Sequence, residues 1–315
     1  MTPPRSATAF APATTSNLAV GFDLLGHPIG DAGDRVTVTR RPAPGVGMGP
    51  VTGHLGITLP ADAAANTAGT AVLRLLADHA PDLGVEVSIE KGIPLGSGIG
   101  GSAASAVAAV VAANALLPRP LPHAALFPYA LAGEAVASGA AHGDNVAPSL
   151  LGGLVLVRGA DSADMVRIPT PPALRCVVVL PRMRLDTRDS RAVLPAAVPL
   201  GDVIRQCANL AGVLAGCFTG DLALIGRSLR DVMVEPHRAR LIPGFAAVQA
   251  AAMAAGALGC SISGGGPSLF AWCEGDDGAE RCRRAMVEAF AAAGVAAEGL
   301  SGPVDGPGAR LEAVA

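Results

Sequence analysis

The feature that most constrains this sequence is a glycine-rich segment at residues 94–105, which reads PLGSGIGGSAAS. The residues before it, 85–90, alternate apolar and polar side chains, as a half-buried strand does. The residues after it, 103–117, are almost wholly apolar and rich in alanine, which predicts a buried helix. A strand, a glycine-rich turn and a helix in this order can direct backbone N–H groups and the positive end of a helix at an anion.

The glycine segment alone does not decide between a phosphate site and an ordinary turn, because many such turns bind nothing. No lysine follows the glycines, so the segment is not a GxxxxGK[ST] motif. Residues 96–101 also fit the spacing GxGxxG, but the acidic residue expected further along a dinucleotide-binding unit is missing. If the segment binds phosphate, it belongs to another class of phosphate loop.

The composition limits the classes of protein and partner. The chain has 315 residues, half of them hydrophobic and 16% charged, which suggests two domains or one large one. A net charge of −3 without a basic block argues against nucleic acid as the main partner. No apolar run is long enough for a membrane span, and no signal peptide is evident. Since no membrane span is expected, we also expect no membrane partner. The six cysteines form no CxxC pair, so we expect free thiols and a cytoplasmic location.

The hydrophobic periodicity predicts a chain of mixed helices and strands. Expected strands are 7–11, 35–40, 154–157 and 176–181, and expected helices are 66–79, 122–137, 200–217, 222–231, 245–255 and 278–293. The segment 12–17 is expected to end the first strand, and the Pro- and Gly-rich residues 41–50 are expected to form a loop. Charges and prolines between 161 and 173 place a domain boundary there, giving domains 1–167 and 168–315.

Several polar residues stand in apolar or turn-like surroundings, and each has an ordinary explanation. Asn17 and Asp23 lie in a mostly apolar segment, where a turn residue and a solvated acid are the simplest interpretation. Glu134 has apolar neighbours along its helix, so it is either exposed or held inward for a cation. Residues 142–148 concentrate His, Asp and Asn before a proline, which by itself indicates a surface loop.

Three segments in order, 12–26, 94–105 and 261–271, resemble the motifs of the GHMP kinase superfamily. The glycine segment is similar to that family's PxGxGLGSSAA pattern, and 261–271 to its glycine-rich C-terminal motif. The resemblance covers nearly the whole chain. It implies an α+β fold of two domains, the first like domain 2 of ribosomal protein S5 and the second ferredoxin-like. It also implies an ATP-dependent transferase that uses Mg²⁺.

The substrate-side segments resemble those of the homoserine kinase family within this superfamily. These segments are 12–23, 142–148, 187–195 and 235–244. The resemblance implies phosphorylation of the side-chain hydroxyl of L-homoserine to O-phospho-L-homoserine, a step of threonine biosynthesis. It also implies a homodimer.

The expected substrate residues suit a small zwitterionic alcohol. Guanidinium groups bind a carboxylate, and acidic and amide oxygens bind an ammonium group. By resemblance, Arg191 and Arg238 match the carboxylate positions, while Asn17 and Asp23 match the ammonium positions with Asp144 close by. The full set of expected substrate residues is Asn17, Asp23, His142, Asp144, Thr187, Arg191 and Arg238.

The resemblance also implies a nucleotide site. Ser102 and Glu134 match the magnesium ligands, and one hydroxyl with one carboxylate suffices because Mg²⁺ keeps phosphate oxygens and water. Segment 264–266 should pack against the glycine segment. Gly101 stands where the family usually has a serine, but Ser102 is retained, so we expect magnesium binding to persist. The expected nucleotide residues are Asn66, Lys91, Pro94, Leu95, Gly96, Ser97, Gly98, Ile99, Gly100, Gly101, Ser102, Ala103 and Ala104.

The expected mechanism lacks a strong base. Mevalonate and galactokinases carry an Asp at a fixed distance after the magnesium Glu, and the same distance from Glu134 reaches Asn145. Phosphoryl transfer tolerates this, because its loose transition state depends mainly on alignment and charge stabilisation. We therefore expect Asn145 to orient the hydroxyl, while Ser102 and Glu134 control charge.

Two other functions remain possible from the sequence. One is another kinase of the superfamily, acting on mevalonate, a sugar or a diphosphocytidyl polyol, and Arg191, Arg238 and Asn145 argue against it. The other is a binding protein that keeps the fold without catalysis, and retention of both Ser102 and Glu134 argues against that.

Overall fold

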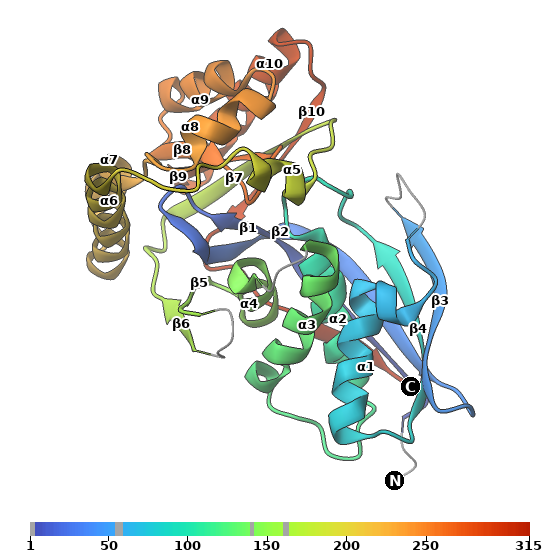
Figure 1. The fold of residues 1–315 in the computed structure, drawn as a ribbon. Coiled ribbons are helices and arrows are strands. Elements are labelled where there is room, and N and C mark those ends of the chain that lie inside the picture. The colour runs from blue at the N-terminus through green and yellow to red at the C-terminus, as the bar shows by residue number, and fades with distance from the viewer. Residues whose placement is uncertain (1–3, 54–58, 139–141, 160–163) are drawn as a thin grey trace.

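The computed structural model describes residues 4–53, 59–138, 142–159 and 164–315. It contains two β-sheets with helices packed on them (Figure 1). In the first sheet the strand order is β11-β1-β2-β4-β3, with β5 pairing with β2 and β6 with β5. In the second sheet the order is β10-β7-β9-β8.

The first sheet takes strands from both ends of the chain. Its strands are β1 (Ser6–Asn17), β2 (Gly21–Arg40), β3 (Gly45–Gly53), β4 (Gly84–Lys91), β5 (Leu154–Val157), β6 (Met165–Ile168) and β11 (Arg310–Val314). Strand β11 is antiparallel to β1, so the two ends of the described chain lie together (Figure 1). The predicted domain boundary between 167 and 168 stays a prediction.

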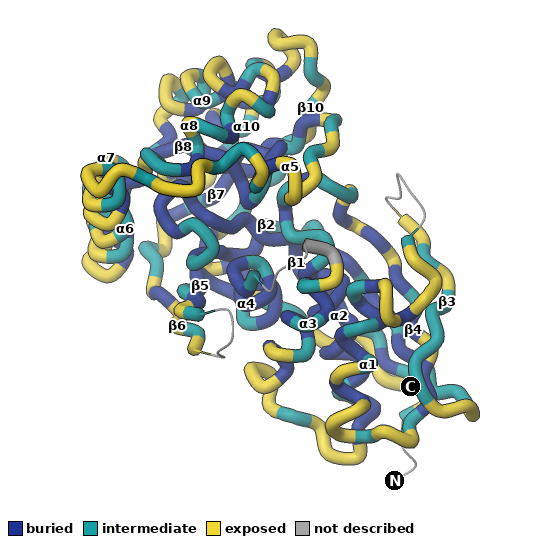
Figure 2. Tube along the Cα trace, viewed as in Figure 1, coloured by how far each residue is buried: buried dark blue, intermediate teal, exposed yellow. Residues whose placement is uncertain are grey.

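Four helices cover one face of this sheet (Figure 1): α1 (Thr67–His79), α2 (Gly101–Asn114), α3 (Phe127–Ser138) and α4 (Gly143–Leu151). Every residue of α2 from 103 to 113 is buried, because Ala and Val surround the whole helix and present no polar face (Figure 2). The buried helix predicted after the glycine segment is therefore confirmed. Its N-terminus fixes the end of that segment in the interior.

The second sheet consists of β7 (Leu174–Pro181), β8 (Gly259–Ile262), β9 (Leu269–Glu274) and β10 (Ala297–Pro303). Helices α9 (Phe245–Ala254) and α10 (Gly275–Ala292) pack on it through Val248, Met286 and Phe290. Helices α5 (Thr187–Ala192) and α8 (Glu235–Arg238) lie near the junction with the first sheet, whereas α6 (Leu200–Thr219) and α7 (Leu222–Ser228) project at one side (Figure 1). Short 3-10 turns occur at Ala63–Ala65, His123–Leu126 and Ala239–Leu241.

Three local predictions were wrong. Residues 41–50 were expected to be a loop, but β3 begins at Gly45 as an edge strand parallel to β4, with Val46 and Met48 against the core. Pro12 was expected to break the first strand, but β1 continues to Asn17, with a register shift between Pro12 and Thr14 that accommodates the proline. Residues 142–148 are not a surface loop, because α4 starts at Gly143 and buries its apolar face.

None of the helices in the described part of the chain combines the length and the apolar character needed to cross a membrane.

Candidate active site

A cavity of about 590 Å³ lies where segments of both sheets meet. It collects residues that are far apart in the sequence, from the ends of β1 and β2, the glycine segment, α3, α4, α5 and the turn after β8. The predicted site residues that line it are Asn17, Asp23, Lys91, Pro94, Leu95, Gly96, Ser97, Gly98, Gly100, Gly101, Ser102, Glu134, His142, Asp144, Asn145, Thr187, Arg191 and Arg238. Asn66, Ile99, Ala103 and Ala104 are buried outside this lining.

The glycine segment needs glycine at alternate positions. Gly96, Gly98 and Gly100 have φ of 65°, 76° and 68°, which is the left-handed region. A Cβ on Gly100 would lie 2.1 Å from Thr14 Oγ1, so the segment also packs too closely for any larger residue there. Because α2 begins at Gly101, within the segment, the glycines join a turn of backbone N–H groups to a helix N-terminus inside the cavity wall.

The turn after β8 packs against the glycine segment, as the sequence predicted for 264–266. A Cβ on Gly98 would lie 2.4 Å from the carbonyl oxygen of Gly266. Ser263 Oγ donates to the Gly98 carbonyl at 2.9 Å, and Ser268 Oγ donates to the Ser97 carbonyl at 2.6 Å. The second half of the chain therefore supports the glycine segment from outside.

A buried ion pair supports the same segment from inside. The ammonium of Lys91 donates to the Asp34 carboxylate, to the Gly101 carbonyl at 2.8 Å and to Ser105 Oγ at 3.0 Å. Asp34 also accepts from Ser105 Oγ and from the backbone N–H groups of Gly92 and Ile93. These contacts use all three ammonium protons and join both ends of the glycine segment. In this arrangement Lys91 supports the segment from beneath.

Asn66 has a structural contact set. Its side-chain oxygen accepts from the N–H groups of Ala68 and Gly69 and so caps α1, and its amide nitrogen donates to the Pro60 carbonyl. The next residue, Thr67, lines the cavity instead.

Ser102 and Glu134, the expected magnesium ligands, lie next to each other. Their side chains share a hydrogen bond, although one begins α2 and the other belongs to α3. Burial, with a smaller contribution from the charge of Asp144, raises the pKa of Glu134 to about 7. The open question about Glu134 is thus resolved, since it is held inward. A hydroxyl and a buried carboxylate of this kind fit a hard cation such as Mg²⁺.

Three carboxylates converge in the cavity. Burial, with a smaller contribution from the nearby charge of Asp23, raises the pKa of Asp144 to about 6. His142 Nδ1 lies 3.6 Å from Asp23 Oδ2, and its pKa is lowered by burial. Glu134, Asp144 and Asp23 are gathered in one cavity and are at least partly buried. Such a group of carboxylates favours cationic ligands.

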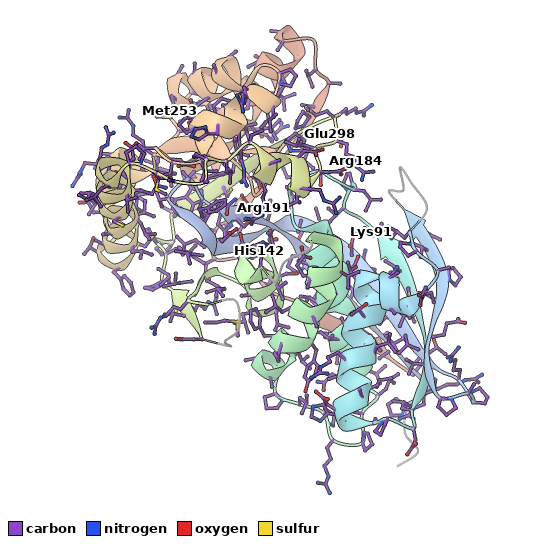
Figure 3. The ribbon with its side chains drawn as sticks, viewed as in Figure 1. Lys91, His142, Arg184, Arg191, Met253 and Glu298 are labelled. Carbon is purple, nitrogen blue, oxygen red and sulfur yellow. The ribbon has the colours of Figure 1, made fainter. Side chains whose placement is uncertain are left out.

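Two arginines face these acids from the second half of the chain. Arg191 Nη2 donates to Asp23 Oδ1 at 2.6 Å, and Figure 3 shows Arg191 of α5 close to His142 at the start of α4. Arg238 is buried, with Nε donating to the Ser190 carbonyl at 3.0 Å and Nη1 to the Gly264 carbonyl at 3.1 Å. Burial, followed by the charge of Arg191, lowers the pKa of Arg238 to about 10, so it remains cationic at neutral pH.

A turn with left-handed backbone connects β1 to β2, and the cavity-lining residues Asn17 and Asp23 lie on either side of it. Asn17, Leu18 and Ala19 have φ of 67°, 46° and 60°, which is costly for residues with a Cβ. The Asn17 amide nitrogen donates to the Gly264 carbonyl at 2.7 Å, and its oxygen accepts from the N–H of Asp23 at 2.9 Å. Asn17 is therefore a link between both halves of the cavity wall as well as a polar lining residue.

Asn145 occupies the position where a base would be expected. Its side-chain oxygen accepts from Thr14 Oγ1 at 2.8 Å, and its amide nitrogen donates to Ser16 Oγ at 2.9 Å. Two hydroxyl groups of β1 thus fix the orientation of the amide. It can align a hydroxyl but has no useful basicity.

Some lining residues were not predicted from the sequence: Ser16, Leu59, Thr67, Ser105, Arg184, Leu185, Asp186, Arg188, Asp189, Gly264, Gly265 and Gly266. Segment 264–266 was expected near the glycine segment but not as lining. Asp34 was missed as well. It follows Gly30 and Gly33 and precedes the predicted strand 35–40, and in the sequence an acid at such a position looks like a solvated turn residue. A hydrophobic pattern cannot show that such a carboxylate is buried under a neighbouring strand.

Comparison with known proteins identifies the family. The model for the GHMP kinases N-terminal domain matches residues 66–153, and the model for the GHMP kinases C-terminal domain matches residues 204–292. The chain belongs to the GHMP kinase family. The predicted α+β two-domain kinase fold is thereby confirmed, and the family supports ATP as the phosphoryl donor.

Several GHMP kinases that the chain resembles over nearly its full length are named homoserine kinase. The homoserine kinase of Xylella fastidiosa strain 9a5c is 50% identical over 305 residues, 97% of this chain and 94% of that protein. That of Chlorobium phaeovibrioides is 43% identical over 298 residues, 91% and 93% of the two chains. The crystal structure of homoserine kinase from Cytophaga hutchinsonii has a TM-score of 0.94 and 42% identity, with 97% of each chain covered.

Proposed function

We propose that this chain phosphorylates the side-chain hydroxyl of L-homoserine with ATP to give O-phospho-L-homoserine, a step of threonine biosynthesis. One observation carries the proposal. Arg191 and Arg238 meet Asp23 and Asp144 in one cavity beside the glycine segment, so anion-binding and cation-binding groups face each other next to a phosphate loop. A small zwitterion satisfies both sets at once. The relatives named homoserine kinase, at 43–50% identity over more than nine-tenths of the chain, support the same substrate.

We assign the substrate groups by charge. The carboxylate binds at Arg191 and Arg238, and the ammonium group binds at Asp23, Asn17 and Asp144. His142 and Thr187 complete this part of the cavity. The proposal is also consistent with the pairing of Asp23 with Arg191, since a bound zwitterion can supply a new partner to each.

The nucleotide lies along the glycine segment, where backbone N–H groups of residues 96–102 and the N-terminus of α2 stabilise its phosphates. Ser102 and Glu134 hold Mg²⁺, which neutralises phosphate charge when bound. Lys91 contributes by fixing the segment, because its three protons are donated to protein groups.

The transfer uses alignment in place of a strong base. The homoserine hydroxyl oxygen forms a bond to the γ-phosphorus while the bond to ADP breaks, and the hydroxyl proton leaves to a phosphoryl oxygen or to water. Asn145 holds the hydroxyl in line, because Thr14 and Ser16 fix its amide. We predict that Asn145→Ala lowers kcat by about a hundredfold with a smaller change in KM. A variant with unchanged turnover would contradict this role.

A coupled ADP-release assay with L-homoserine, L-serine, L-threonine and mevalonate tests the function. We expect turnover with L-homoserine well above the other three. Preference for mevalonate would indicate another kinase of the family. Nucleotide binding without ADP release from any alcohol would indicate a non-catalytic binding protein.

We also propose a cytoplasmic homodimer. The three most exposed large apolar side chains among the described residues, Leu200, Ile204 and Phe218, all belong to α6. Sedimentation measures the oligomeric state directly, and Ile204→Glu tests whether this helix takes part. A wild-type protein that sediments as a monomer at micromolar concentration would refute the dimer.

A further inference from the structure

One aromatic ring lies against both proposed carboxylate-binding arginines. The guanidinium carbons of Arg191 and Arg238 lie 5.3 and 5.1 Å from the centroid of the Phe22 ring. Phe22 directly precedes Asp23 in β2 and is half-buried. We infer that Phe22 is a positioning residue that holds both guanidinium groups ready for the substrate carboxylate. This inference deepens the proposed function and rests on it.

The two cations need such a partner because they repel each other. The charge of Arg191 disfavours the charged form of Arg238, in addition to the larger effect of burial. The face of an aromatic ring attracts a cation, and this attraction is stronger where water is excluded. An acid in place of Phe22 would also attract both arginines, but it would use the N–H groups that a carboxylate ligand requires. An aliphatic side chain would fill the space without attracting either.

The ring leaves hydrogen-bond donors available. Among the described residues, Arg191 Nε is buried and has no hydrogen-bond partner. A buried guanidinium N–H without a partner is costly unless a ligand accepts from it. Phe22 thus contributes attraction from the side without accepting from Arg191 Nε, which stays available to a planar anion.

The backbone around Phe22 fixes the ring relative to Arg238. Asn17 accepts from the N–H of Asp23, and its amide donates to the Gly264 carbonyl, which also accepts from Arg238 Nη1. Asp23 itself has a φ of 59°. The turn that carries Phe22 and the guanidinium of Arg238 therefore share one acceptor, the Gly264 carbonyl, which links the backbone at Phe22 to that arginine.

The test compares a substrate that has the carboxylate with one that lacks it. Steady-state ADP release is measured with L-homoserine and with 3-aminopropan-1-ol, which keeps the hydroxyl and the ammonium group. We expect Phe22→Leu to raise KM for L-homoserine about tenfold and to leave kcat within about twofold. For 3-aminopropan-1-ol, kcat/KM should change less than about twofold. Phe22→Tyr keeps the ring face and should stay near the wild type with both substrates.

The outcomes separate the inference from the proposed function. Equal losses with both substrates, or an unchanged KM for L-homoserine, would overturn the role of Phe22 while the kinase activity stands. A wild-type protein that releases no ADP with L-homoserine would overturn the proposed function and the inference with it. Thermal unfolding is recorded for each variant, and Phe22→Met provides a second non-aromatic side chain if the Leu variant does not fold.

Discussion

At the residue scale, Glu134 suits a metal site, but its buried negative charge destabilises the folded protein when no metal ion is bound. The pKa of Glu134 is raised to about 7, above its ordinary value of 4.5. A protein loses stability through such a carboxyl group as the pH rises from the pKa of the group in the unfolded chain to its higher pKa in the folded chain. We expect Glu134→Gln to increase the free energy of unfolding by up to about 3 kcal/mol at pH 8 in EDTA, with almost no difference at pH 4.5. Chemical denaturation at both pH values measures this.

The same variant gives its own control when the ligands are added. Mg²⁺ and a non-hydrolysable ATP analogue should stabilise the wild type and have a much smaller effect on Glu134→Gln, because binding to the folded state alone raises stability. Equal stabilisation of both proteins by the magnesium nucleotide would remove Glu134 from the metal site. A variant less stable than the wild type at pH 8 would contradict the destabilising role of the charge.

The sequence predicted most of the lining residues but not what each side chain contacts. Arg191, Asp23 and Asn145 were expected in one site through motif resemblance, and they line one cavity. Lys91 and Asn66 were expected at the nucleotide, but their polar groups bind Asp34 and the start of α1. Hydrogen-bond partners depend on strands brought together from distant positions, and residue type does not reveal that pairing.

At the element scale, the close contact between the glycine segment and the turn after β8 predicts a sharp difference between two similar glycines. Gly98 and Gly220 have nearly equal φ, 76° and 75°, so alanine strains both backbones to a similar extent. Only at Gly98 would the new Cβ meet a backbone atom, the Gly266 carbonyl oxygen at 2.4 Å, whereas Gly220 has open space. We expect Gly98→Ala to raise KM for ATP tenfold or more. Gly220→Ala should leave it within about twofold.

Thermal unfolding of the two alanine variants separates the backbone strain at a positive φ from the displacement of the glycine segment by the new Cβ. Both variants should lose a similar small amount of stability because of the positive φ. Gly98→Ala should lose more, because displacement of the segment breaks the hydrogen bonds that Ser263 and Ser268 donate to it. If Gly98→Ala retained the wild-type KM for ATP, the glycine segment would not depend on support from the second half of the chain.

The long, strongly patterned elements were predictable, and the short or edge elements were not. Helices α1, α6 and α10 follow apolar periodicity and begin or end near the predicted residues. Strand β3 was missed because it is a glycine-rich edge strand whose pairing with β4 is non-local. Helix α4 was missed because its burial depends on packing against β1 and β2, which a short polar segment does not show.

At the scale of the whole molecule, one buried histidine joins the two sheets. His27 of β2 is fully buried, and Trp272 of β9 donates from Nε1 to its Nε2 at 3.0 Å. An indole N–H can only donate, so His27 Nε2 must be the acceptor and Nδ1 carries the proton, which it donates to the Pro28 carbonyl at 2.8 Å. Burial lowers the pKa of His27 to about 4. The contact between the sheets therefore requires the neutral ring.

This requirement predicts a loss of stability in mild acid. The unfolded chain binds a proton at His27 below about pH 6.5, whereas the folded chain does so only near pH 4, so stability falls between these values. The full shift corresponds to about 3 kcal/mol. We expect His27→Gln, which is neutral at every pH and can still accept from Trp272, to lose less stability than the wild type between pH 6.5 and pH 4. The raised pKa values of Glu134 and Asp144 act in the opposite direction in both proteins, so they cancel in this difference. Parallel pH profiles of the free energy of unfolding for the two proteins would show that the histidine does not control the contact between the sheets.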